Sequence, residues 1–231
     1  MEEKMSLWKK FYGAVWGSPS KTFENIVQKP DFWGAAILMM AVSLLMSIPI
    51  LPKIREAVIL NLQNAPPEIK LTPAQIDTTA NWAVYTTPVF SLLGPLLIWL
   101  IIALLLKLFN AFTGEKAQFK TLFAVSVFSY LPVVLDGIIK TPLVMAAEAQ
   151  RMTQVTISPA MFLPPPDGLT PDRMYTFFSQ FDPFIIWSLV LTALGASIAM
   201  KVPVLRAGIY VFSLWMIFVL GVTFLSGGGA A

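Results

Sequence analysis

Five long apolar stretches occupy most of this sequence and restrict it to the folds of membrane proteins. A helix needs about 20 mostly apolar residues to cross the hydrocarbon core of a bilayer. The stretches approach or exceed this length, at residues 32–51, 84–106, 121–147, 184–200 and 207–225. Because lipid offers no hydrogen-bond partners, the backbone of each must bond internally, as a helix does. We therefore predict an all-α polytopic membrane protein, with a bundle of five transmembrane helices over residues 32–225.

Composition argues against catalysis. Only 13% of the 231 residues are charged, where a soluble domain carries about a quarter. Cys and His are absent, which removes disulfides, thiolate or imidazole metal ligands and Ser–His or Cys–His pairs. An intramembrane aspartyl protease needs two facing carboxylates, and the apolar stretches contain one acid, Asp136. We expect no enzyme activity, no cofactor and no metal; a net charge of +3 gives no reason to expect nucleic-acid binding.

The distribution of basic residues predicts the topology. Loops on the cytoplasmic side of a membrane are enriched in Lys and Arg. If the N-terminus is cytoplasmic, the inner segments contain ten of the 16 basic residues, and their connections at 107–120 and 201–206 are short. We predict a cytoplasmic N-terminal segment at 1–31, an outside C-terminus and a flexible tail at 226–231.

The N-terminal segment has the pattern of short amphipathic helices. Leu7, Phe11 and Val15 recur at helical spacing with aromatic residues beside them, and Ser18-Pro19 is the start signal of a second helix. Such helices commonly lie in the membrane interface, with their lysines toward anionic lipid. The alternative is a docking surface for a cytosolic or membrane protein partner. Its candidate contact residues are Lys9, Lys10, Phe23, Lys116 and Lys120.

Two proline-rich outside loops, 52–83 and 148–183, each contain a Leu-Thr-Pro triplet, at 71–73 and 169–171. In each triplet Thr is a good N-cap and Pro a good first-turn residue, so each predicts a short helix. The proline run at 164–166 is expected to be extended.

Asp136 and Lys140 lie within the third apolar stretch. An intramembrane ionisable residue is a functional candidate by default. The spacing of four residues, acid first, also favours an ion pair within one helix. We favour a mutually neutralising pair near the outer end of the helix over an ion or proton site.

Small residues and prolines predict how the spans pack. Ala193, Gly195 and Ala199 would let another helix approach closely, within the bundle or, less expectedly, in a homo-oligomer. Gly94-Pro95 and Pro132 predict kinks in the second and third spans.

The order of several short motifs resembles the Yip family, the Ypt/Rab-interacting group of membrane proteins, in its bacterial branch. The motifs are Pro19-Ser-Lys-Thr-Phe-Glu24, Lys29-Pro-Asp-Phe-Trp33, Phe119-Lys120, Tyr130-Leu-Pro132, Asp182-Pro-Phe184, Ile186-Trp187 and Leu194-Gly195. The resemblance implies five spans, a cytoplasmic N-terminus and a multi-pass protein of the bacterial inner membrane. Eukaryotic members bind Rab-type GTPases through the N-terminal segment and associate with one another.

These observations support two hypotheses on function. The first is a non-enzymatic integral membrane protein that acts through protein partners or by organising the membrane. The alternative is a small oligomeric permease or channel for ions, lipids or small solutes, formed by the kinked spans with Asp136 as its charged element.

Overall fold

The computed structural model describes residues 5–65, 71–114, 117–164 and 172–226, and the regular elements within these ranges are all helical. The α-helices are α1 Leu7–Val15, α2 Pro19–Gln28, α3 Trp33–Ser47, α4 Leu51–Gln63, α5 Pro73–Thr113, α6 Phe119–Ser129, α7 Leu131–Ala146, α8 Arg173–Ser179, α9 Pro183–Met200 and α10 Val204–Ser226. Short 3₁₀ turns form η1 Ile48–Ile50, η2 Ala149–Gln154 and η3 Pro159–Phe162.

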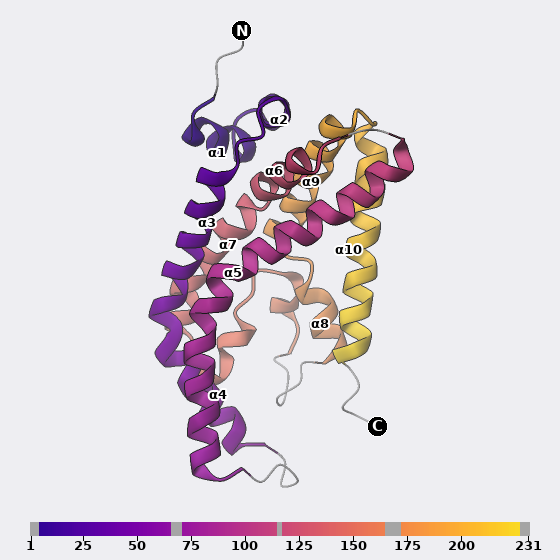
Figure 1. Ribbon diagram of the computed structural model, residues 1–231. Coiled ribbons are helices and arrows are strands. Elements are labelled where there is room, and N and C mark those ends of the chain that lie inside the picture. Colours follow the sequence, from indigo (N-terminus) through magenta and orange to yellow (C-terminus); the bar gives the residue numbers. More distant parts are fainter. Residues whose placement is uncertain (1–4, 66–70, 115–116, 165–171, 227–231) are drawn as a thin grey trace.

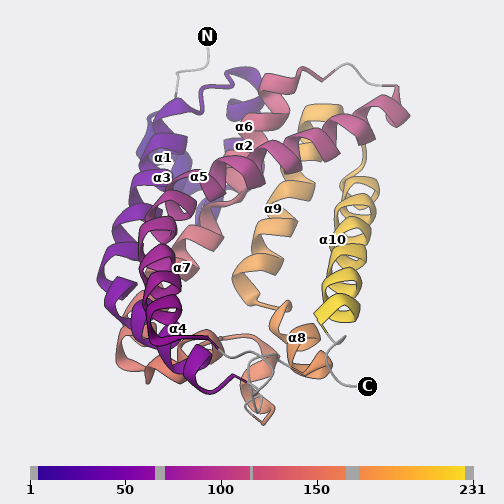
Figure 2. The ribbon, with the colours of Figure 1, turned by 60° about the horizontal axis from the view of Figure 1, so that its bottom comes forward.

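Five helical segments in the described ranges are long and apolar enough to cross a membrane, which confirms the predicted all-α bundle of five spans. They are Trp33–Gln63, Pro73–Thr113, Phe119–Ala146, Pro183–Met200 and Val204–Leu225. Helices α1 and α2 lie at one end of this bundle and α8 at the other (Figure 1). In both views α10 runs alongside α9, and α4 alongside the first half of α5 (Figure 2).

The first two spans extend well beyond the apolar stretches of the sequence. Helix α3 continues through η1 into α4, and α5 has 41 residues, about 60 Å at 1.5 Å per residue. Most of the region expected to be an outside loop, 52–83, is therefore a helical hairpin. Its arms are joined by the Arg55 side chain, which pairs with Asp77 and donates to Asn81 Oδ1 at 3.2 Å.

The Thr72-Pro73 signal is confirmed as a helix start, although the helix is long. The Thr72 hydroxyl accepts from the Gln75 N–H, and the Gln75 side chain accepts from the Thr72 N–H, which is a complete capping box. The second triplet, 169–171, lies outside the described residues, as do 165–166 of the proline run and 227–231 of the tail.

Prolines bend two of the spans. Helix α5 changes direction sharply along its length (Figure 1), and two prolines, Pro88 and Pro95, lie inside it. The third span is broken at Tyr130, which ends α6 and precedes α7, with Pro132 in the first turn of α7. The kinks expected at Gly94-Pro95 and Pro132 therefore correspond to a bent and a broken helix.

The core lies where α2, α6 and α9 meet beneath the second half of α5. Its largest fully buried side chains include Trp99, Phe128, Phe23 and Ile26. Hydrogen bonds between hydroxyl groups and neighbouring helices lie in the same region. Ser126 Oγ donates to the Trp99 carbonyl at 2.9 Å, and Thr192 Oγ1 donates to Ser129 Oγ at 2.9 Å. The N-terminal segment thus supplies part of the core of the membrane bundle.

Candidate functional site at the N-terminal hairpin

Helices α1 and α2 form a helical hairpin, here called the N-terminal hairpin, which packs firmly on the spans. Ser6 caps α1, and Pro19 occupies the first turn of α2. The two helices cross closely at Gly13, where a Cβ would come within 2.3 Å of Thr22 Oγ1. Only glycine fits this crossing without displacing Thr22.

Gly195 forms the seat for the hairpin on α9. A Cβ at this position would lie 2.6 Å from Val125 Cγ1 and 2.8 Å from Phe23 Cδ1. The small residues of α9 therefore serve packing within this chain at Gly195. Ala193 is buried as well, and Ala199 is half-buried. A second contact joins the hairpin to α9, because the rings of Trp16 and Trp187 lie edge to face with centroids 6.3 Å apart.

Burial corrects two of the candidate contact residues. Phe23 is fully buried, and Lys10 is 2% exposed with its ammonium 5.6 Å from the centroid of the Phe128 ring, a cation–π distance. Neither side chain is available to a partner. The reason is that each side chain lies on the face of its helix that packs against the core. Lys10 is on that face of α1 together with the apolar residues Ala14 and Val15, which are also buried. Lys9 and Lys120 are exposed, and Lys116 lies outside the described residues.

The exposed side of the hairpin has two chemically different faces. On α1 and its C-cap, Trp8, Tyr12 and Trp16 follow one another at intervals of four residues and are each more than 60% exposed. On α2, the exposed residues are polar: Ser20, Lys21, Glu24 and Gln28. The aromatic row suits the membrane interface, and the polar face suits water.

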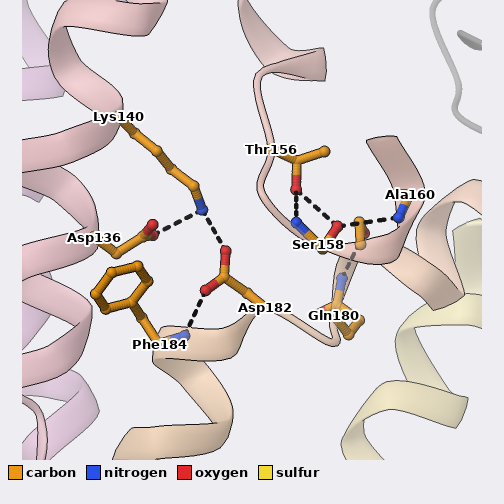
Figure 3. Close-up of polar contacts among 9 residues, drawn as sticks. Asp136, Lys140, Thr156, Ser158, Ala160, Gln180, Asp182 and Phe184 are labelled. Atoms are coloured by element: carbon orange, nitrogen blue, oxygen red, sulfur yellow. Dashed lines mark hydrogen bonds and ion pairs between the residues drawn. The ribbon is translucent and has the colours of Figure 1, made fainter. Parts of the chain in front are cut away.

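The second candidate site, at Asp136 and Lys140, contains a third member that sequence reasoning missed. Lys140 Nζ donates to Asp136 Oδ2 at 2.7 Å and to Asp182 Oδ2 at 2.6 Å (Figure 3). Asp182 also caps α9, because its Oδ1 accepts from the Phe184 N–H at 2.8 Å. The sequence signals the helix start at Asp182, since Asp followed by Pro before an apolar run is typical of one, but it does not signal the contact with Lys140.

This triad joins α7 to the first turn of α9. The two carboxylates share one ammonium, and the N-terminal dipole of α9 adds positive potential at Asp182. Both carboxylate oxygens of Asp182 accept a hydrogen bond. Asp136 Oδ1, in contrast, is buried with no hydrogen-bond partner among the described residues. The arrangement supports the structural interpretation, extended from a pair within one helix to a clamp between two spans.

Other polar contacts organise the end of the bundle away from the hairpin. Lys53 Nζ donates to the Met145 carbonyl at 2.6 Å and to the Ala147 carbonyl, and so caps the C-terminus of α7. The Tyr175 hydroxyl of α8 donates to the Gln154 carbonyl, and burial raises the pKa of this phenol. Within the described ranges, no three Asp or Glu side chains cluster in a way that could hold a metal ion.

Comparison with known proteins gives one result that covers nearly the whole chain. The model of the Yip1 domain matches residues 13–225, from α1 to the last turn of α10. No curated protein and no solved structure matches the chain. The matched range includes all five spans and α2, which fits an N-terminal hairpin that packs as part of the bundle. The chain is a multi-pass membrane protein that belongs to the Yip1 family.

Proposed function

We propose that this protein is a non-enzymatic scaffold of the membrane, which acts by docking a protein partner on the polar face of α2. The observation that supports the proposal is that the N-terminal hairpin is packed firmly against the transmembrane bundle. Phe23 and Ile26 are fully buried, so α2 presents Ser20, Glu24 and Gln28 from a fixed position. A surface that is already ordered loses little conformational entropy when a partner binds.

Three of the exposed residues of α2, namely Ser20, Glu24 and Gln28, form a single stripe, because they are four residues apart. Lys120 is exposed in the first turn of α6, a helix that packs against α2. Together they give a mixed polar and charged surface, which is typical of the rim of a regulated protein interface. The link of the Yip family to Rab-type GTPase partners supports a protein as the ligand of this surface.

We place this surface in the cytoplasm. The support is the excess of Lys and Arg in the segments on the same side as the N-terminus. In a bacterium the corresponding membrane is the inner one, with α4 and α8 toward the outside.

The test is crosslinking in the native membrane, followed by isolation through a tag at residue 1 and identification of the captured proteins. Deletion of residues 1–30 is a poor control, because it would remove Phe23 and Ile26 from the core. The sharper variant is Glu24→Arg, with Glu148→Arg as the matched control, since Glu148 is also exposed and lies between α7 and η2.

A partner captured by the unmodified protein and by Glu148→Arg, and lost with Glu24→Arg, is the expected result. If the same proteins are captured by all three, the α2 surface is not the docking site. If only copies of this chain are captured, the homo-oligomeric permease becomes the better hypothesis.

A further inference from the structure

The N-terminal hairpin carries an open groove between its aromatic and polar faces. The groove has a volume of about 630 Å³, and its lining includes Trp8, Lys9 and Tyr12 of α1 and Lys21 of α2. Trp8 and Tyr12 are the aromatic residues that line it, and they are 71% and 66% exposed.

The groove lies at the level where the first span begins. Leu7, at the start of α1, packs next to Gly34 in the first turn of α3, with its Cδ2 3.6 Å from where a Cβ would lie. The neighbouring residue Trp33 is 66% exposed. Exposed Trp and Tyr side chains at the end of a span are typical of the headgroup region. The groove is therefore at the boundary between lipid and water.

Two lysines border the groove, one from each helix. Lys9 and Lys21 are both exposed, and within the described part of the chain neither forms an ion pair. Two exposed lysines at the rim of an apolar groove complement a ligand that is anionic at one end and apolar at the other. A phosphate bound by these lysines at the rim, with a hydrocarbon chain along Trp8 and Tyr12, satisfies both parts.

We propose that this groove is a binding site for one anionic phospholipid of the surrounding bilayer. The position at the interface favours a lipid over a soluble peptide, because the bilayer presents lipid headgroups at this level at high local concentration. The site is separate from the stripe of Ser20, Glu24 and Gln28, so the lipid site and the partner surface are independent proposals.

The test is native mass spectrometry of the purified full chain, titrated with phosphatidylglycerol or with phosphatidylcholine of the same acyl chains. The test variant is Lys9→Gln/Lys21→Gln, and the matched control is Lys120→Gln, which neutralises an exposed lysine outside the groove. We expect the double variant to bind phosphatidylglycerol roughly 25-fold more weakly, about fivefold for each lysine. Lys9→Arg/Lys21→Arg, which keeps both charges, is expected to retain binding.

Three outcomes would overturn the proposal. One is equal affinity of the unmodified protein for the two lipids. Another is a loss with Lys120→Gln as large as with the double variant, which would indicate attraction to overall charge. The third is displacement of phosphatidylglycerol by inorganic phosphate at equal concentration, which would show a simple anion site. If the double variant melts at a lower temperature than the unmodified protein, Trp8→Ala/Tyr12→Ala tests the apolar wall instead, with the same expected loss.

Discussion

Gly195 of α9 lies so close to the ring of Phe23 that a Cβ at position 195 would come within 2.8 Å of ring atom Cδ1. The contact joins a helix that precedes the first span to the fourth span. Because the same Cβ would also lie 2.6 Å from Val125 Cγ1 of α6, the packing of three helices depends on the absence of one side chain.

We predict that Gly195→Ala destabilises the protein by about 1–3 kcal/mol, since an extra methyl group in a packed core forces its neighbours apart. The measurement is the midpoint of thermal unfolding of the purified protein in one detergent. Gly208→Ala in α10 is the matched control, because a Cβ there meets nothing within 4 Å. Equal midpoints for the two variants would contradict the packing described.

Phe23→Ala should release the hairpin from the spans. Truncating a buried Phe costs about 3–5 kcal/mol, through lost burial and the cavity left behind. The expected consequence is faster tryptic cleavage after Lys21, which is exposed but held in the ordered helix α2. Tyr12→Ala removes an aromatic ring from the exposed side of the same hairpin and should leave the cleavage rate unchanged. Cleavage that is insensitive to Phe23→Ala would show that the hairpin is held by other contacts.

In the Asp136–Lys140–Asp182 triad, Lys140→Met should be the most harmful single change. It leaves two carboxylates without their shared ammonium. Asp182 is buried but Lys140 and Asp136 are only partly buried, so the cost should lie below the value of about 3–5 kcal/mol for a fully buried ion pair broken from one side. Asp136→Asn removes one negative charge and leaves the Lys140–Asp182 bond of 2.6 Å intact, so its effect should be smaller. Unfolding midpoints check this order. The triple variant with Asp136→Asn, Lys140→Met and Asp182→Asn should recover part of the loss, and failure to do so would count against an electrostatic cause.

Asp136 also tests the permease hypothesis. With Asp136 bound to Lys140 in a clamp, we expect proteoliposomes containing the protein to conduct protons and K⁺ no faster than liposomes without it. The Asp136→Asn variant should behave identically. A flux that the unmodified protein supports and Asp136→Asn abolishes would refute the scaffold proposal and favour transport.

The sequence was sufficient to predict the number and type of spans because their apolar length is a strong, local signal. It also predicted a helix start at Thr72-Pro73 and a kink at Pro132, where capping and proline chemistry act within a few residues; the structure has a long helix and a broken helix there. It did not predict that α4 and α5 extend past the apolar stretches. Those extensions mix apolar residues with charged and polar ones, and the contacts that hold them together, such as Arg55 with Asp77, join different parts of the chain.

The candidate site was less predictable because its contacts also join residues that are far apart in the sequence. Lys10 and Phe23 precede the membrane region, so the sequence predicts them at the surface. Nothing in their immediate neighbours indicates that α6 and α9 cover them. Asp182 was missed as the partner of Lys140, since 42 residues separate the two in the chain. Asp136 and Lys140 were found because an ion pair of residues four apart in one helix is a local pattern.

The seat of Phe23 on Gly195 also sets an order of events during synthesis. The two residues are about 170 positions apart, so α2 leaves the ribosome long before the helix that covers it. At about 5–20 residues per second, α9 is synthesised roughly ten to thirty seconds after Phe23 and Ile26. During that interval the apolar side of the nascent hairpin is not covered by α9, and the adjacent bilayer is the first apolar surface that it can contact.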